Sequence, residues 1–259
     1  MTASDTPFWR TAISEVRPNE IRVRGYNLLE LIGNRSFGDV VYLLLSGELP
    51  AGNEGRMMDA LLVSATEHGL MAPSVDATRF VASGGVPLQA AVASGINAMG
   101  EFHAGAVDAS ARLILEADAL DLPAAEAGRE LVKTCREQKR LLSGFGHKVH
   151  HPDPRTARVM QVAEDLGVFG PFCELGLAIE DATEEFYSKR LPMNIDGAMA
   201  CIMLELGLDP ALGKAFYVIG RAPGLVAHAF EEQTREGPYR DIGWENVAYD
   251  GPDARELPE

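Results

Sequence analysis

Hydrophobic residues recur along most of this chain at the three- and four-residue spacing of amphipathic helices. The first clear case places Phe37, Val40 and Leu44 on one face. Ser36 precedes this face in a capping-box pattern, and Gly47 follows it as a helix terminator. The same period predicts further helices over 57–68, 74–83, 86–99, 104–118, 123–138, 155–166, 171–187, 192–206 and 210–233.

The two ends of the chain depart from the helical period. Near the N-terminus, Ile13 and Glu15, and then residues 21–24, alternate between apolar and charged around the turn at 17–20, which predicts a β-hairpin. The last segment, 237–259, is polar and contains prolines and aspartates, so we expect it to lie extended over the surface. The predicted fold class is therefore all-α with a short N-terminal β-hairpin.

Composition narrows the class of protein. The chain has 259 residues, of which 46% are hydrophobic and 24% charged, as in soluble globular proteins. A net charge of −15 argues against nucleic acid as a partner, because a phosphate backbone requires a basic surface. No segment approaches the roughly 18 apolar residues of a membrane span, and the first ten residues lack a signal-peptide layout.

The three cysteines indicate a compartment. Cys135, Cys173 and Cys201 form no CxxC pair and are odd in number. We therefore expect reduced, mostly buried thiols, which are typical of a cytoplasmic protein.

One segment, 144–155 (GFGHKVHHPDPR), combines backbone freedom with acid–base and carboxylate-binding chemistry. Gly144 and Gly146 allow the backbone to approach a ligand closely. The imidazole of His147 can exchange a proton near neutral pH, and the guanidinium of Arg155 can bind a carboxylate through two parallel hydrogen bonds. We interpret this segment as part of a site for a carboxylated carbonyl compound.

Three further residues carry candidate chemistry. His68 and His103 stand beside or near glycine, and Asp196 falls in the first turn of an otherwise apolar predicted helix. Each also has a structural interpretation, since a lone histidine is often satisfied within a fold and a helix dipole favours an acid in the first turn. The three histidines of 147–151 fit no usual zinc spacing, so we predict no metal site.

Short motifs along the chain match those of one family. They occupy 24–26 (RGY), 42–50 (YLLLSGELP), 67–70 (EHGL), 144–155, 194–196 (NID) and 219–224 (IGRAPG). In this order and spacing they resemble the citrate synthase superfamily, in particular its citryl-CoA lyase branch, which also forms the C-terminal module of ATP-citrate lyase. The resemblance covers most of the chain.

The resemblance implies a role for each candidate. Asp196 matches the carboxylate that takes the α-proton of acetyl-CoA, and His103 matches the histidine that hydrogen-bonds the thioester carbonyl as it becomes an enol. His147 matches the residue that exchanges a proton with the oxygen on the α-keto carbon. Four residues match those that orient the oxaloacetate carboxylates: His68, Arg155, Arg221 and Arg240. The resemblance implies that Arg240 is supplied by the partner subunit, and Arg235 is the alternative for this role.

Coenzyme A enters only as a thioester substrate or product, and no tightly bound cofactor is implied. Candidates for contacts with it are Gly144, Gly146, Lys148, Lys189 and Arg190, with His150 or His151 as further candidates for its phosphates. A solvated charged face explains the basic residues of this set equally well.

Two features favour the lyase branch. The chain is shorter than a typical citrate synthase, and its segment 234–249 (TREGPYRDIGWENVAY) resembles the ending of the lyases. His103, by contrast, matches the synthases and departs from the lyase module of ATP-citrate lyase. The predicted function is cleavage of citryl-CoA to acetyl-CoA and oxaloacetate, with condensation by a citrate synthase or 2-methylcitrate synthase as the alternative. A non-catalytic CoA- or dicarboxylate-binding relative is less favoured.

The resemblance also implies an architecture. We expect a large helical domain made of 1–103 and 207–259, which forms a dimer, and a small helical domain over 104–206 on the CoA side. We therefore predict a homodimer or a higher even oligomer, with small-molecule substrates and no nucleic-acid or membrane partner.

Overall fold

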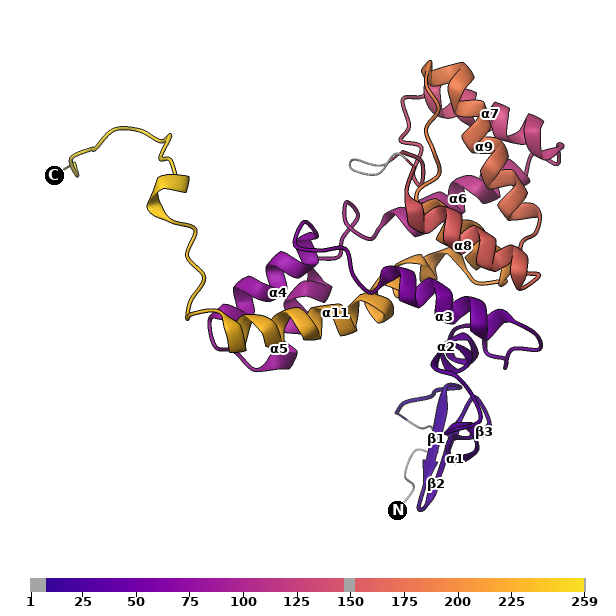
Figure 1. The fold of residues 1–259 in the computed structure, drawn as a ribbon, viewed down its shortest axis with the longest axis horizontal. Helices are drawn as coiled ribbons and strands as arrows, with labels where there is room; N and C mark the ends of the chain where they lie inside the picture. The colour runs from indigo at the N-terminus through magenta and orange to yellow at the C-terminus, as the bar shows by residue number, and fades with distance from the viewer. Residues whose placement is uncertain (1–7, 147–151, 259) are drawn as a thin grey trace.

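The computed structural model describes residues 8–146 and 152–258 (Figure 1). Within these ranges the chain forms eleven α-helices and one small sheet. The helical fold with a β structure at its N-terminus confirms the predicted fold class. The sheet lies at one end of the elongated molecule, and the C-terminal tail projects from another (Figure 1).

The sheet contains three antiparallel strands in the order β1 (Ser14–Arg17), β2 (Glu20–Val23) and β3 (Tyr26–Asn27). Strands β1 and β2 form the predicted hairpin, in which Val16 pairs with Ile21. Strand β3 was not predicted, because two residues are too few to show an alternating pattern. A four-residue helix, α1 (Leu28–Leu31), follows directly.

Helix α2 (Phe37–Ser46) begins with the predicted capping box. The Asp39 N–H donates to Ser36 Oγ at 3.1 Å, and the Ser36 N–H donates to Asp39 Oδ2 at 3.0 Å. It ends at Gly47, whose φ of +95° is a left-handed conformation that glycine adopts without strain. Local sequence therefore determines both ends of this helix.

Helix α3 (Glu54–Ala65) begins and ends three residues earlier than predicted, so it ends before His68. The reason lies in the next residues, where one carboxylate oxygen of Glu67 accepts the N–H groups of His68 and Gly69 at 2.8 and 2.6 Å. Those two N–H groups would point back to carbonyls of α3 if the helix continued. The side chain of Glu67 replaces these carbonyls and turns the chain.

Most of the remaining helices form two groups, and α8 packs on α3 and α10. One group contains α4, α5 and the long α11, which pack on each other, and the other contains α6, α7, α9 and α10 (Figure 1). Their bounds are α4 (Pro73–Ser83), α5 (Leu88–Asn97), α6 (Ala106–Asp118), α7 (Ala124–Glu137), α8 (Pro154–Asp165), α9 (Pro171–Tyr187), α10 (Ile195–Glu205) and α11 (Gly213–Arg235). Two short 3₁₀ turns, η1 (Pro210–Leu212) and η2 (Trp244–Asn246), complete the list.

Helix α10 is the central element of its group. Nine of its eleven residues are buried, and it contacts α6, α8, α9 and α11. It begins at Ile195, three residues later than predicted, because Met193 bridges to Phe145 in extended conformation and Asn194 caps the helix. A helix buried on nearly all sides explains why its sequence shows a continuous apolar run.

The cysteine prediction is confirmed, since Cys135, Cys173 and Cys201 are all buried and unbridged. Across the described ranges, none of the helices combines the length and the apolar character that a bilayer crossing demands.

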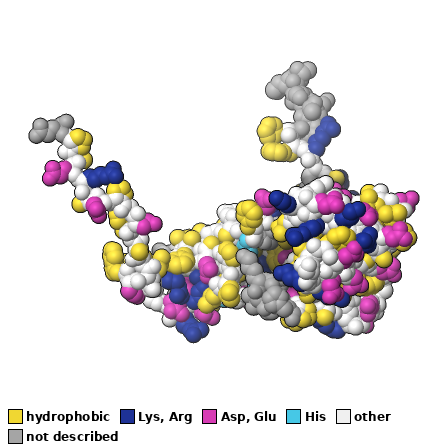
Figure 2. All heavy atoms as spheres, turned by 90° about the horizontal axis from the view of Figure 1, so that it is seen from above, with side chains coloured by type: hydrophobic (Ala, Val, Ile, Leu, Met, Phe, Trp, Pro, Cys, Tyr) yellow, Lys and Arg dark blue, Asp and Glu magenta, His cyan; other side chains and the backbone are white. Residues whose placement is uncertain are grey.

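The C-terminal tail is extended as predicted, but from Gly237 it projects away from the body (Figure 1). It carries exposed hydrophobic side chains, including Tyr239 and Trp244. Hydrophobic side chains occur along the projecting arm in Figure 2.

Candidate active site

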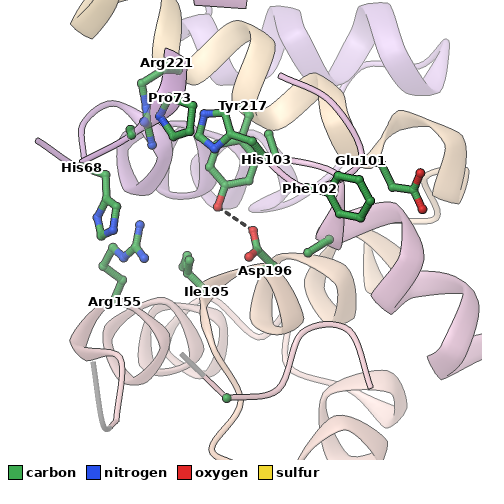
Figure 3. Close-up of a pocket in the computed structure, with 15 residues that line it drawn as sticks. His68, Pro73, Glu101, Phe102, His103, Arg155, Ile195, Asp196, Tyr217 and Arg221 are labelled. Carbon is green, nitrogen blue, oxygen red and sulfur yellow. Dashed lines mark hydrogen bonds between the residues drawn. The ribbon is translucent and has the colours of Figure 1, made fainter. Parts of the chain in front are cut away.

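A pocket of about 390 Å³ lies where segments from both helix groups meet (Figure 3). Its wall contains six of the residues singled out from the sequence: His68, His103, Gly146, Arg155, Asp196 and Arg221. In the close-up view His68 and Arg155 lie toward one end, Glu101 and Phe102 lie toward the other, and Asp196 lies between them. Motifs that lie far apart in the sequence therefore contribute residues to one cavity.

Asp196 is placed by the N-terminus of α10. The side-chain oxygen of Asn194 accepts the N–H groups of Asp196 and Gly197 at 2.9 and 3.2 Å, which caps the helix. The same asparagine donates from Nδ2 to the carbonyl of Gly146 at 2.7 Å, and its N–H donates to the carbonyl of Gly144 at 2.9 Å. Asn194 thus joins the glycine-rich loop to the helix that carries the carboxylate.

The two glycines of this loop have different surroundings. Gly144 has φ of +87°, and a Cβ there would come within 2.9 Å of Gly197 Cα and collide with Ser110. This backbone contact accounts for glycine at 144, which does not line the pocket. Gly146 has φ of +77° and does line the pocket.

His103 faces the N-terminus of α4. The N–H of Ser74 donates to His103 Nε2 at 3.4 Å, and Ser74 Oγ lies 2.9 Å from the same nitrogen. A backbone N–H can only donate, so Nε2 is an acceptor and the proton of the neutral ring is on Nδ1. The positive end of the helix dipole also disfavours a positive charge on this imidazole.

The electrostatic surroundings of His103 also disfavour a positive charge on its ring. Burial of the ring and then the positive charge of Arg221 lower the pKa of His103 from its ordinary value. The histidine is therefore neutral near pH 7 and can offer an N–H from Nδ1 to a carbonyl oxygen.

The residue after His103 has a strained backbone. Ala104 has φ of +68°, in the left-handed region that side chains with a Cβ rarely adopt. This conformation leads the chain from the pocket wall into α6, which begins at Ala106.

Arg155 is oriented by Asp153, the N-cap residue of its own helix. The buried carboxylate of Asp153 accepts from Arg155 Nε at 3.1 Å and from Nη2 at 2.7 Å. Burial opposes the charge of Arg155, but the Asp153 carboxylate outweighs burial and raises the pKa of Arg155. A guanidinium has five N–H donors, so this pair orients the group and leaves donors for a ligand.

Arg221 is buried on α11 and donates from Nε to the carbonyl of Ala65 at 2.6 Å. Gly220 and Gly224 flank it, and a Cβ at Gly220 would lie 2.7 Å from the Leu62 carbonyl oxygen. These two glycines allow α11 to approach the end of α3 closely. The glycines of the 219–224 motif therefore place the arginine, which burial alone would disfavour.

His68 is held on a turn that is itself fixed by Glu67. The Glu67 carboxylate, besides accepting the N–H groups of the turn, lies 3.1 Å from His228 Nε2 on α11. Burial opposes the charge of Glu67, but these N–H groups and His228 outweigh burial and lower the pKa of Glu67. An ionised carboxylate therefore anchors the turn.

Sequence reasoning missed two residues of this site. Tyr217 lines the pocket and donates to Asp196 Oδ1 at 2.6 Å. Its position one helical turn before Arg221 was a usable signal, because residues four apart share a helix face. Ser74 had no such signal, since its contact with His103 depends on how α4 packs.

Several predicted residues do not line the pocket of the described chain. His147, Lys148, His150 and His151 lie outside the described residues. Lys189 and Arg190 are exposed beyond the end of α9, and Arg190 pairs with Glu180 and Asp181 at 2.8 Å.

The two arginines proposed for the partner subunit are also outside this pocket. Arg240 is bound by the buried Glu232, at 2.8 Å from Nε and 2.6 Å from Nη2, and Arg235 is exposed and pairs with Glu231. Arg79 donates to the same Glu232 at 2.7 Å.

The arrangement has a definite chemical capacity. Cationic and imidazole groups at one end of the pocket match a ligand with carboxylates. A carboxylate and a neutral imidazole donor in the same cavity match proton transfer at a carbon next to a carbonyl group. Across 8–146 and 152–258, the His, Cys, Asp and Glu side chains form no group of three suited to a metal ion.

Comparison with known proteins gives a family match. The family profile for the citrate synthase C-terminal domain matches residues 2–56 and 52–241. The putative citrate synthase 2 of Mycobacterium tuberculosis is 34% identical over 184 residues, which cover 68% of this chain and 47% of that protein. The chain spans less than half the length of the curated relatives it matches.

Two solved structures have the same fold. The citryl-CoA lyase of Hydrogenobacter thermophilus is 42% identical, with a TM-score of 0.92 over 97% of this chain and 98% of that one. An ATP citrate lyase from Methanothrix soehngenii, solved with citrate and coenzyme A, is 20% identical, with a TM-score of 0.84 over 97% of this chain and 43% of that one.

Proposed function

Because this chain belongs to the citrate synthase superfamily, we propose that it cleaves citryl-CoA to acetyl-CoA and oxaloacetate. The observation that carries the proposal is the pocket in which Asp196 and His103 share a cavity with Arg155, Arg221 and His68. The 42% identity to a citryl-CoA lyase along nearly the whole of both chains supports the lyase reaction.

The substrate has a preferred orientation in this proposal. Its carboxylates bind at the end lined by His68, Arg155 and Arg221, where charge-assisted hydrogen bonds compensate for their desolvation. The thioester extends toward the end lined by Glu101 and Phe102, and Phe102 is fully exposed there. Coenzyme A thus enters from the open side of the pocket.

The cleavage step breaks the bond between the carbinol carbon and the methylene carbon next to the thioester. The hydroxyl group loses its proton to His147, by the role that the resemblance assigns, and becomes the keto group of oxaloacetate. The electron pair of the broken bond moves into the thioester to form the enolate of acetyl-CoA. His103 hydrogen-bonds the enolate oxygen through its Nδ1 hydrogen and keeps that proton. Asp196 enters this step as the carboxylic acid and delivers its proton to the carbon, and the proton held by His147 restores the acid through solvent before the next turnover.

The second candidate is the reaction of a citrate synthase, which condenses acetyl-CoA with oxaloacetate and then hydrolyses the citryl-CoA thioester with water to citrate and free coenzyme A. His103 supports it, because an imidazole that stabilises an enol serves both directions equally, and so does the 34% identity to a putative citrate synthase. A citrate synthase or 2-methylcitrate synthase would use the same residues. The acyl group of the CoA thioester then distinguishes citrate synthase from 2-methylcitrate synthase, through a pocket contact worth ~1–3 kcal/mol.

We also propose the remaining parts of the assembly. A large domain of 1–103 and 207–259 and a small domain of 104–206 close on the substrate, and two copies form a dimer. Arg240, or Arg235 in its place, reaches the partner's pocket, and Lys148, Lys189 and Arg190 contact coenzyme A together with the glycine loop. Three buried, unbridged cysteines support a reducing compartment such as the cytoplasm.

The test is to mix the protein with citryl-CoA and measure oxaloacetate, and to mix it with acetyl-CoA and oxaloacetate and measure free thiol. We expect cleavage to be the faster reaction. Asp196→Asn should lower kcat by about 10²–10⁴-fold, because it removes the acid–base group without changing its size.

Asp209→Asn is the matched control, since Asp209 caps the exposed turn η1 and asparagine caps as well. It should keep wild-type kcat. Faster condensation would favour the synthase, whereas absence of both reactions would leave a non-catalytic binding protein.

A further inference from the structure

Tyr217 occupies a position in the pocket that no assigned role accounts for. It lies on α11 four residues before Arg221, and its side chain is 7% exposed. The guanidinium carbon of Arg221 lies 5.7 Å from the centroid of the Tyr217 ring. The ring is therefore part of a packed wall, and only its hydroxyl end has a polar function.

The hydroxyl of Tyr217 points at Asp196, and Figure 3 shows the two groups joined across the pocket. The distance from the hydroxyl oxygen to Asp196 Oδ1 is 2.6 Å. An ionised carboxylate can only accept, so the phenol donates. This length is typical of an O–H bond to a charged oxygen.

The phenol keeps its proton under working conditions. Burial, followed by the negative charge of Asp196, raises the pKa of Tyr217 well above its ordinary value. Tyr217 is thus a permanent donor and cannot act as a base in this pocket.

Asp196 is then held from two directions. Its backbone N–H is bound by the Asn194 side chain on α10, and its Oδ1 is bound from α11. The hydrogen bond from Tyr217 opposes rotation of the carboxylate about its Cβ–Cγ bond, and it connects the carboxylate to α11, the helix that also carries Arg221.

We propose that Tyr217 is a positioning residue that holds the Asp196 carboxyl group in one orientation, both as the carboxylate and as the acid that delivers its proton. This inference rests on the proposed function, because it assumes that Asp196 transfers the proton at carbon. Asp196 lies between the carboxylate-binding end of the pocket and the end lined by Glu101 and Phe102 (Figure 3), and a fixed orientation of its carboxyl group reduces the freedom that must be lost before proton transfer.

Other charged groups also act on Asp196, so the test must isolate the phenol. The titratable and charged residues that line the pocket with it are His68, Glu101, His103, Arg155, Tyr217 and Arg221. Tyr217→Phe removes only the hydroxyl and retains the ring against Arg221. Tyr42→Phe is the matched control, because its half-buried hydroxyl lies 3.5 Å from the Leu206 carbonyl, and Tyr42 does not line the pocket.

The first measurement is the pH titration of the Asp196 carboxyl carbon by NMR, assigned by comparison with Asp196→Asn. A hydrogen bond to the charged form lowers a carboxyl pKa, so its loss in Tyr217→Phe should move the titration midpoint to higher pH. Tyr42→Phe should leave the midpoint in place. An unchanged midpoint in Tyr217→Phe overturns the proposal, and this result does not depend on the enzyme activity.

The second measurement is citryl-CoA cleavage. We expect Tyr217→Phe to lower kcat by about 10–100-fold with KM nearly unchanged, because substrate carboxylates are bound elsewhere while the proton-transfer group is misplaced. Wild-type kcat in this variant overturns the positioning role. If the wild-type protein itself fails to cleave citryl-CoA, the proposed function is wrong, and the titration alone then decides whether Tyr217 controls Asp196.

Discussion

Ala104 illustrates how a single residue can carry strain beside a reactive group. Its φ of +68° lies directly after His103, where a residue without a Cβ would adopt the same conformation freely. An L-residue in the left-handed region costs about 1–2 kcal/mol. The residue that follows the neutral imidazole therefore has a strained backbone, which lowers the free energy of unfolding.

This strain gives a stability prediction. Ala104→Gly should raise the free energy of unfolding by about 0.5–1 kcal/mol, because relief of the strain exceeds the greater entropy of glycine in the unfolded chain. Urea unfolding followed by circular dichroism measures the change.

Ala119→Gly is the matched control, since Ala119 ends α6 with φ of −64° and has no strain to relieve. It should lower stability by about 0.5–1 kcal/mol. A loss of stability in Ala104→Gly as well would show that the left-handed backbone carries no strain.

The sequence predicted single residues of the pocket unevenly. His68, His103, Arg155, Asp196 and Arg221 were found through their motifs and do line one cavity. Their local partners were not all visible. The pairing of Arg155 with Asp153 could be anticipated from adjacency on the chain, but the contacts of Ser74 and Tyr217 join residues that are far apart in sequence.

At the scale of elements, the contact between α11 and α3 positions most of the carboxylate-binding end. Gly220 and Gly224 lie on the face of α11 that meets the end of α3, and Arg221 donates to the Ala65 carbonyl from the same region. His228 on α11 also holds Glu67, which fixes the His68 turn. One helix interface therefore places both Arg221 and His68.

Gly224→Ala tests this interface. A Cβ at Gly224 would lie 2.8 Å from Glu67 Oε2 and would collide with the Thr66 carbonyl. Overpacking costs about 1–3 kcal/mol, while alanine in place of glycine gains about 1 kcal/mol of helix propensity, so stability should fall. The value of kcat/KM should fall too, because the His68 turn and Arg221 shift together.

Thermal unfolding and steady-state kinetics measure the two effects. Gly237→Ala is the control, since a Cβ there meets nothing within 4 Å. A Gly224→Ala variant as stable and as active as this control would mean that close approach of α11 is not required.

The helices themselves were largely predictable, because their period and caps are local properties. The capping box at Ser36 and the glycine end at Gly47 appear as expected. The errors fall where a side chain replaces a helical hydrogen bond. The Glu67 side chain ends α3 at Ala65, three residues earlier than predicted. The bridge between Met193 and Phe145 moves the start of α10 to Ile195, three residues later than predicted.

At the scale of the whole molecule, the C-terminal tail poses the main question. Arg240 stands at its start, bound by Glu232, whose pKa is lowered by Arg240 first and also by Arg79. Tyr239 directly before it, and Ile242, Trp244 and Tyr249 beyond it, have exposed side chains. Hydrophobic side chains in such an arm are consistent with the dimer that we propose.

Subunit mixing tests whether Arg240 serves the partner's pocket. Asp196→Asn and Arg240→Ala should each be nearly inactive alone. If the pocket is shared, a mixed dimer has one intact site, and random mixing of the two variants should restore about a quarter of wild-type activity.

Arg235→Ala replaces Arg240→Ala in a parallel mixture as the control. Restoration with Arg235→Ala alone would assign the role to Arg235. If an arginine variant that is inactive alone gains no activity on mixing, that arginine does not act across an interface.

The sequence by itself determined the helical periods, the capped ends, the hairpin and the set of residues able to carry the chemistry, because each of these depends on neighbours within a few positions. Tertiary structure alone decided which of them meet. Asn194 joins the glycine loop to Asp196, Ser74 sets the tautomer of His103, and Tyr217 orients the carboxylate. These contacts form only when α4, α10 and α11 pack around one cavity, and no local pattern encodes that packing.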